Sequence, residues 1–470
     1  MDQSQNISRG EQKSTKDHDN DSCVVTTDYP AYQYEFDMPC YIARLPVELL
    51  CEIFAHCLPF GRHGDQYPIP RIEDAPMLLC HVCSHWRQVA LSFTALWSSF
   101  SGRCSYSYRN RNPERNVRVA TQALVKLWLE RSHPHPISTE FDSSMLPAVR
   151  QLLFVNAYRW DSLSIMLDDE IIGELMAIPQ AGAPLVENLS LIVYECEKTH
   201  LEIPSLLPRF PNLRRLYYHN SRTLNRFFLN IPWSQMTHIT LCCEFPADQF
   251  LKSLGQCMAA EYIDVQWIIP SAPIQPAQVI LPRLAYLRID SCAGDITLLD
   301  AFTVPSLRTL KFNTQSDLAH RNFKALDALV SRSSCTLETF HMEDLALLEE
   351  DLIGYLTLPC LQSVHELEIS SRNIFDQTLS LPAYPSMTSG VGGIFPHLER
   401  LHLRYMTTTD GLLSNAIASR WRKSEDPNAP ASLKGVKLLF ARDKVLPHNL
   451  DTLHITKFEE QGLSVSWSWY

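Results

Sequence analysis

The sequence predicts an α+β fold, in which a small N-terminal helical module is followed by an irregular α/β repeat array with one curved parallel sheet. Two observations lead to this prediction. Two apolar stripes with helical spacing lie between residues 47 and 97, and a six-residue pattern with apolar first, fourth and sixth positions recurs from residue 160 onward. The length of 470 residues exceeds one ordinary core, so it suits several domains or one elongated array.

Composition and charge narrow the classes of partner. The formal net charge is -11, which argues against nucleic acid or an anionic membrane as the main partner, because both require a basic surface. No run of eighteen apolar residues occurs and the first thirty residues are polar, so we expect neither a membrane span nor a signal peptide, and a cytoplasmic or nuclear location. The 14 cysteines are scattered through apolar patterns and are interpreted as free, mostly buried thiols.

Residues 1–38 are predicted to form a disordered tail. The stretch from Met1 to Asp28 is rich in Ser, Thr, Asp, Asn, Gln and Lys and contains few apolar residues. Such a segment cannot bury enough apolar surface to offset the entropy that it would lose on ordering.

Residues 39–105 are predicted to form the helical module. Leu45-Pro46 starts the first helix, because a proline at the first helical position loses no hydrogen bond, and Glu48 complements the positive end of the helix. The helix is expected to end near Leu58-Pro59. Its apolar stripe is formed by Leu49, Leu50, Ile53, Phe54 and Cys57.

A second helical pattern follows an insert from Phe60 to Asp74. Ala75-Pro76 restarts the chain, and the apolar positions up to Ala90 have helical spacing. We expect this helix to bend or break near Cys83-Ser84. An LW pair, Leu96-Trp97, ends the module.

The order of these elements resembles an F-box: an LP pair, then VELLCEIF, then a cysteine before HWRQVA, then LW. The arrangement, including its continuation LVKLWLERS, is similar to that of many F-box proteins of mushroom-forming fungi. The insert is longer than the usual first inter-helix loop of the family. The alternative interpretation is an unrelated helical hairpin whose LP pair is only a helix start.

The resemblance implies a docking function. In this family the module binds a Skp-type adaptor and thereby attaches a target-recognition domain to a cullin-RING ubiquitin ligase. Carried over to this sequence, Leu45 and Pro46 would contact the adaptor. The apolar residues that would pack the helices or extend this interface are Leu49, Leu50, Ile53, Phe54, Trp86 and Trp97.

Residues 106–135 are predicted to link the module to the rest of the chain through a helix. The segment from Pro113 to Arg131 begins with proline and has apolar residues at helical spacing. The apolar face is expected to pack on both neighbours and consists of Val117, Ala120, Leu124, Leu127 and Trp128.

Residues 136–470 are predicted to form a repeat domain of short strands. Most successive hexapeptides start 23 to 30 residues apart, and the segments between them, such as those beginning at Pro246 and Phe323, have helical periodicity. We expect these helices to cover the convex side of the sheet. The hexapeptides start at Trp160, Val186, Leu213, Met236, Ala260, Leu284, Leu307, Leu337, Val364, Leu398, Leu433 and Leu450.

The hexapeptides resemble leucine-rich repeats, and the resemblance implies an α/β leucine-rich-repeat solenoid with a curved parallel sheet. The fourth and sixth positions would face the core, and the mostly polar fifth position would lie on an exposed concave face. The ninth position of the family is usually Asn or Cys, and only Cys292 matches it here. The alternative interpretation is that each hexapeptide is an ordinary strand of an α/β domain.

The sequence contains no motif for catalysis or metal binding that we can defend. GxGxxG, P-loop, GxSxG and HExxH motifs are absent. Cys80 and Cys83 form a CxxC pair beside His85, but a structural zinc site needs four ligands and no second pair lies at a suitable distance. We therefore expect neither enzymatic activity nor a cofactor. The histidines expected on the concave face, as contact residues, are His341, His402 and His454.

Together these observations predict the substrate-recognition subunit of a cullin-RING (SCF-type) ubiquitin ligase, which binds a Skp-type adaptor and through it a cullin. The repeat domain would recruit an unknown protein substrate. The alternatives are a leucine-rich-repeat scaffold that binds the adaptor without ligase activity, and a hydrolase within the repeat domain. Tyr262, Tyr286 and Arg288 are the expected hot spot. The full set of expected substrate-binding residues is Tyr217, Tyr262, Tyr286, Arg288, Lys311, His341, Arg400 and His402.

Overall fold

The chain forms two compact units, Met1–Pro46 and Val47–Tyr470. The predicted tail (1–38) and the first part of the predicted linker (106–121) lie outside the residues that the structure describes. The computed structural model describes residues 42, 45–58, 67–102, 122–193, 205–220, 231–269, 278–291, 296–314, 324–383, 394–421, 432–440 and 448–469.

Helices lie near the start of the second unit where the apolar spacing predicts them. α1 (Val47–His56) buries Leu50 and Phe54, which are one helical turn apart. The ring of Phe54 lies 5.0 Å from the ring of Trp86 on α2 (Ser84–Ser92), so the two helices pack through aromatic side chains.

The second helical pattern is divided at Cys83, near the position that the spacing predicts. The 3₁₀ helix η2 (Leu78–His81) ends before this residue. The Cys83 thiol then caps α2, because its Sγ accepts a hydrogen bond from the backbone N–H of Trp86 at 3.4 Å. A further 3₁₀ helix, η3 (Thr94–Trp97), buries Trp97, whose Nε1 donates to the carbonyl oxygen of Ala90 at 2.8 Å.

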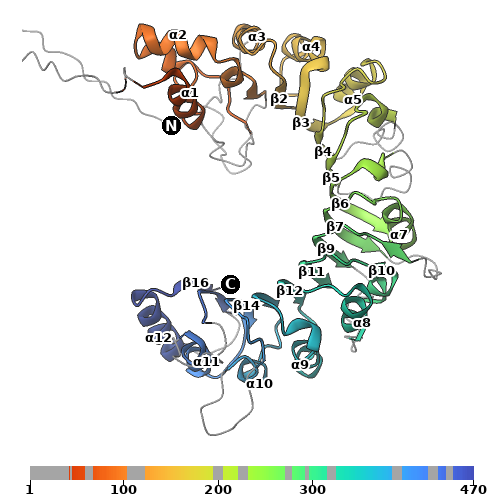
Figure 1. The fold of residues 1–470 in the computed structure, drawn as a ribbon, viewed down its shortest axis with the longest axis vertical. Helices are drawn as coiled ribbons and strands as arrows, with labels where there is room; N and C mark the ends of the chain where they lie inside the picture. Colours follow the sequence, from red (N-terminus) through yellow and green to blue (C-terminus); the bar gives the residue numbers. More distant parts are fainter. Residues whose placement is uncertain are drawn as a thin grey trace, which may run out of the picture. The chain divides into compact units, whose positions relative to one another are not determined.

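Among the described residues, a parallel sheet of 14 strands forms the body of the unit Val47–Tyr470 (Figure 1). Neighbours in the sheet follow the order of the sequence, and β8 (Val279–Ile280) and β10 (Phe302–Thr303) pair separately with each other. The strands of the large sheet are β1 (Ser99–Ser101), β2 (Ile137–Phe141), β3 (Trp160–Leu167), β4 (Asn188–Val193), β5 (Arg215–Asn220), β6 (His238–Pro246), β7 (Tyr262–Ile269), β9 (Tyr286–Ser291), β11 (Thr309–Thr314), β12 (Thr339–Asp344), β13 (Glu366–Ser370), β14 (Arg400–Met406), β15 (Gly435–Phe440) and β16 (Ser464–Trp469).

One face of the sheet holds the core because the apolar positions of successive hexapeptides are in register. Leu287 on β9 pairs with Ile263 on β7 and with Leu310 on β11, and all three side chains are fully buried. A slip of one residue would turn these side chains to the opposite face. The period-two alternation in the sequence therefore specifies both the buried face and the strand register.

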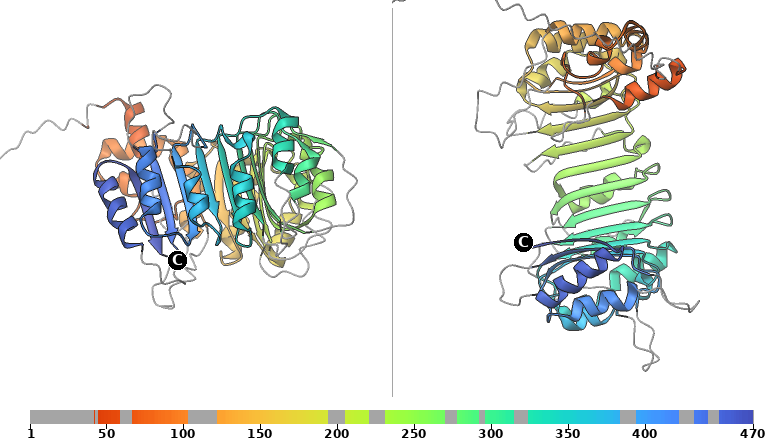
Figure 2. Two further views of the ribbon diagram at one scale, coloured as in Figure 1. Left: turned by 90° about the horizontal axis from the view of Figure 1, so that it is seen from below. Right: turned by 90° about the vertical axis from the view of Figure 1, so that its left-hand side faces the viewer.

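Helices pack on the buried face, and Figures 1 and 2 show them along one side of the sheet. The helical segments expected after Pro246 and from Phe323 are α7 (Ala247–Leu254) and α8 (Lys324–Ser333). None of the described helices is long and apolar enough to cross a membrane. The remaining helices of the described residues are α3 (Gln122–Arg131), α4 (Pro147–Val155), η4 (Ala157–Arg159), α5 (Asp169–Met176), η5 (Leu207–Arg209), η7 (Trp233–Gln235), η8 (Ile296–Ala301), α9 (Glu349–Leu356), η9 (Pro359–Leu361), α10 (Asp376–Ser380), α11 (Leu412–Trp421) and α12 (Asn449–Glu460).

The hexapeptide that starts at Leu450 is not a strand, so this prediction is wrong. It lies in α12, where the Asp410 carboxylate accepts hydrogen bonds from the backbone N–H groups of Leu450 and Asp451 and thereby caps the helix. His454 consequently lies on a helix, with its Nδ1 3.3 Å from Ser414 Oγ, and not on the sheet. The place beside β15 is taken by β16, which the sequence pattern did not predict.

The N-terminal helices contact the sheet, while the predicted boundary at residue 105 lies outside the described residues. β1 directly follows η3 and pairs with β2, and the backbone N–H of Ser101 donates to the carbonyl oxygen of Pro68 at 2.7 Å. Trp97 stacks edge-on against Trp128 of α3, with ring centroids 4.9 Å apart. α3 lies within the predicted linker (106–135), and it contacts the N-terminal helical region through this pair of rings.

Candidate functional site

The expected substrate-binding residues all lie on the sheet face opposite the core, which we call the open face. They occupy the third or fifth positions of their hexapeptides, whereas the fourth and sixth positions are buried. The fifth positions are paired across neighbouring strands, so Arg288, Lys311, His341 and His402 belong to one row that also contains Asp264 and Glu368. The sheet thus brings together residues that are far apart in the sequence.

Three flat rings form a stack on the open face across β6, β7 and β9. The rings of Tyr262 and Tyr286 are nearly parallel with centroids 4.2 Å apart, and His238 stacks on Tyr262 at 5.8 Å. Lys311 Nζ lies 5.8 Å from the centroid of Tyr286. Burial raises the pKa of Tyr262 and of Tyr286, so both hydroxyls stay protonated at neutral pH.

Arg288 is held by carboxylates of the protein itself. Its Nε and Nη2 donate to Asp290 at 3.1 and 2.9 Å, and its Nη1 lies 3.8 Å from Asp264 Oδ2. Burial alone would lower the pKa of Arg288, but the hydrogen bonds and charge of Asp290 raise it. Two of the three expected hot-spot residues thus contact each other as stacked rings, and the third is neutralised by ion pairs.

A carboxylate that sequence reasoning did not select lies between two expected histidines. Glu368 Oε2 is 3.3 Å from Nδ1 of His341 and 3.7 Å from Nδ1 of His402, while Arg404 Nη2 is 2.8 Å from Oε1. Burial would raise the pKa of Glu368, but the hydrogen bond from His402 and the nearby positive charges lower it to about 2. Arg400 is likewise paired, with Nε 2.9 Å from Glu366 Oε2.

His341 is a neutral, poorly solvated member of this group. Burial lowers its pKa to about 4, although Glu368 opposes this shift. The 3.3 Å separation from Glu368 lacks hydrogen-bond geometry, and among the described residues neither ring nitrogen has a hydrogen-bond partner. His341 therefore contributes little charge at neutral pH, and the cation closest to Glu368 is Arg404.

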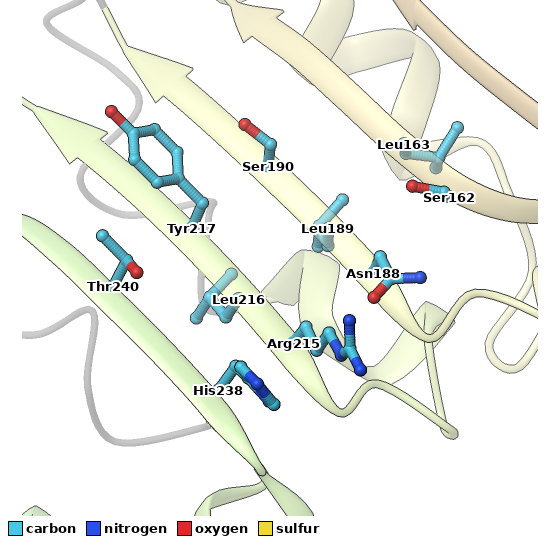
Figure 3. A pocket seen from close by; sticks show the side chains of 10 residues that line it. All are labelled: Ser162, Leu163, Asn188, Leu189, Ser190, Arg215, Leu216, Tyr217, His238 and Thr240. Carbon is cyan, nitrogen blue, oxygen red and sulfur yellow. The ribbon is translucent and has the colours of Figure 1, made fainter. Parts of the chain in front are cut away.

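A hollow of 190 Å³ lies on the open face across β3, β4, β5 and β6 (Figure 3). Tyr217, exposed by 37%, is the one expected substrate-binding residue that lines it. The other polar lining residues were missed, although each occupies a third or fifth position and could have been found by following the register from Tyr217. They are Ser162, Asn188, Ser190, Arg215, His238 and Thr240.

The residues expected to bind the adaptor divide into an exposed set and a buried set. On α1, Leu49 is 51% and Ile53 is 41% exposed, while Leu50 and Phe54 are fully buried. Trp97 is buried and Trp86 is partly buried, and their rings pack against Trp128 and Phe54 respectively. In the unit Met1–Pro46, Leu45 is partly buried and Pro46 is exposed.

Asp410, His448 and Asp451 bring their ligand atoms within 4.8 Å of one another, a spacing that a metal ion could accept. Their atoms already have partners within the protein. Asp410 accepts from two backbone N–H groups of α12, and Asp451 accepts from the backbone N–H of Ser414 and pairs with His448 Nδ1 at 2.9 Å. The cluster is accounted for by the start of α12 and its packing on α11.

Comparison of the chain with protein-family models and with curated proteins finds no match.

Proposed function

We propose that this chain is the substrate-recognition subunit of a cullin-RING ubiquitin ligase. In this proposal the helical region around α1 docks on a Skp-type adaptor, and the adaptor connects the chain to a cullin. The parallel sheet acts as a leucine-rich-repeat solenoid whose open face binds a protein substrate. Such ligases operate in the cytoplasm and nucleus, so the chain is proposed to function there, while other subunits perform the ubiquitin chemistry.

The observation that carries the docking proposal is that α1 is apolar on two faces. Leu50 and Phe54 face the interior, whereas Val47, Leu49 and Ile53 are each more than 40% exposed. Exposed apolar side chains that gather on one helix often mark a protein-interaction site, so this face of α1 suits a partner. This face belongs to the segment that resembles an F-box, and the resemblance specifies the partner as the adaptor.

The strand order supports the proposal of a solenoid. Each of the 14 strands lies beside its neighbours in sequence within the large sheet, as expected when every repeat contacts only the preceding and following repeats. The open face of the sheet carries exposed Tyr and Arg side chains, which are common anchors of protein interfaces. It therefore offers an extended surface for a protein substrate.

Adaptor binding provides the direct test. Changing Leu49 and Ile53 together to Asp removes apolar area and places charge in the proposed interface, so we expect adaptor affinity to fall by at least about tenfold. Val155→Asp, on the exposed end of α4 at 71% exposure, is the matched control and should bind normally. The measurement is recovery of the Skp-type adaptor and cullin with the full chain.

Two results would count against the proposal. Full adaptor binding by the Leu49/Ile53 double variant would exclude this face of α1 as the docking surface. Recovery of the adaptor without a cullin, under conditions in which a reference F-box protein recovers both, would favour the scaffold alternative.

A further inference from the structure

The hollow between β3 and β6 results from a change in side-chain size along two rows of the open face. Small side chains on β3 and β4 leave space, and the longer Arg215, Tyr217 and His238 border it (Figure 3). Leu163, Leu189 and Leu216 are only 2% exposed because their side chains point to the core, so the strand backbones form the floor. The strand register aligns the rows as Ser162, Asn188, Arg215 and His238, and as Ser190, Tyr217 and Thr240.

Among the described residues, Arg215 is the one formally charged side chain that lines the hollow. Arg215 is exposed and forms no ion pair with any described residue, and the lining contains no carboxylate. The neighbouring Arg214 differs, because its Nε lies 4.0 Å from Glu187 Oε1. Arg288, Arg400 and Arg404, farther along the sheet, also have carboxylate partners within 3 Å. Arg215 is thus available to a ligand in a way that these arginines are not.

Other lining groups are positioned before any ligand binds. His238 stacks on Tyr262, and its Nδ1 lies 3.0 Å from Thr237 Oγ1. At the other end Ser162 Oγ hydrogen-bonds the Tyr67 hydroxyl at 2.9 Å. Burial, together with the charge of Arg215, lowers the pKa of His238 although Glu261 opposes this shift, so the ring is neutral at neutral pH. Such fixed polar groups reduce the entropy lost on binding.

The size of the hollow limits the ligand. Its volume of 190 Å³ is below the range of about 300 to 1,000 Å³ that is usual for small-molecule and cofactor sites. The space suits one charged group with a few waters, presented on a longer molecule that crosses the open face.

We infer that this hollow binds an oxyanion, either phosphate or carboxylate, carried by an extended segment of the protein substrate. Arg215 is the charged anchor, because its planar guanidinium can donate two parallel hydrogen bonds to either group. Asn188, Ser190 and His238 supply neutral hydrogen-bonding groups beside it. The inference rests on the proposed function for the source of the oxyanion, but the oxyanion site itself does not depend on the ligase.

Calorimetric titration of the full chain with three probes tests the site: inorganic phosphate, N-acetyl-phosphoserine amide and N-acetyl-aspartate amide. We expect saturable binding of phosphate and of at least one amino-acid probe, and a loss of at least about tenfold in affinity in Arg215→Gln. Arg214→Gln, which removes the adjacent, paired arginine, should bind as the unmodified chain does. Preference for one amino-acid probe identifies a phosphorylated or an acidic segment.

The inference is overturned if the full chain binds none of the three probes, or if Arg215→Gln binds them with unchanged affinity. Asn188→Asp offers a second variant, should Arg215→Gln not fold: a carboxylate in the hollow should abolish binding, and retained binding would overturn the inference. Adaptor recovery by the same variants separates the two proposals. Loss of probe binding with normal adaptor recovery is expected, whereas probe binding by a chain that never binds the adaptor would sustain the site and contradict the ligase function.

Discussion

The open face of the sheet has two regions that differ in how their charges are satisfied. Across β7 to β14, Arg288, Arg400 and Arg404 are paired with carboxylates on the same or neighbouring strands, and half-buried tyrosines stack on each other. Across β3 to β6, Arg215 has no carboxylate partner among the described residues and borders a hollow. The first region contains more of the residue types that dominate interfaces, yet those groups are already engaged.

This difference teaches that residue type alone does not identify a binding site. An arginine that forms a bidentate pair with Asp290 must lose or share that pair before it can bind a partner. An exposed arginine without such a pair loses only hydration. We therefore expect substitutions between β7 and β14 to alter mainly stability, and substitutions between β3 and β6 to alter mainly binding.

Substitution of Glu368 is expected to have the largest effect on the free energy of unfolding. Glu368→Gln removes the negative charge between His341, His402 and Arg404, and should lower the free energy of unfolding by about 3 kcal/mol, because the side chain is only 13% exposed. Glu338→Gln is the control: its partner Arg308 is 66% exposed, and the expected loss is below about 1 kcal/mol. Equal losses in denaturant unfolding would show that the β12 to β14 charges are not a stabilising network.

The pH dependence of stability should show the effect of the lowered pKa of His341. Its pKa is about 4 in the folded protein against 6.5 ordinarily, so the unfolded chain binds this proton first, and stability falls as the pH drops from 6.5 to 4. The shift corresponds to a loss of up to about 3 kcal/mol. His341→Gln should flatten this part of the curve. Glu368, with a pKa of about 2, should cause a further loss only below pH 4.5. An unchanged curve in His341→Gln would contradict the burial of a neutral ring.

Substitution of Arg288 and of Arg215 compares the two regions of the open face directly. Arg288→Gln leaves Asp264 and Asp290 without their cation, and should lower the free energy of unfolding by about 1 to 2 kcal/mol, since Arg288 is one-third exposed. Arg215→Gln should change it by less than about 0.5 kcal/mol. Urea unfolding of both variants measures this, and a reversed order would remove the distinction between the two regions.

The smallest expected effect is the coupling of the stacked tyrosines. A double-mutant cycle with Tyr262→Leu and Tyr286→Leu should give an interaction energy of about 1 kcal/mol, because rings 4.2 Å apart interact beyond their buried area. Additive losses would indicate that each ring is held by the sheet alone and is free to turn toward a partner.

The sequence by itself determined the parts of the fold that depend on local periodicity. Alternation with a period of two located the buried residues of β3 to β7 and β9, and the same pattern placed β11 to β15. Helical spacing located α1, α7 and α8, and the division before α2 at Cys83 was close to its expected place. Such patterns depend only on which side chains share one face of a single helix or strand, so they can be identified without knowing which other elements pack against it.

Only the tertiary structure decided the features that depend on which residues meet across elements. The hexapeptide at Leu450 fits both a strand and a helix, and the distant Asp410 favours the helix by capping its first turn. The pairing of Arg288 with Asp290 is local, but Glu368 meets His341 and His402 only because β12, β13 and β14 lie side by side. The isolation of Arg215 has the same origin, because an ion pair depends on which charged side chains meet across neighbouring strands, and the pattern within one strand does not specify this.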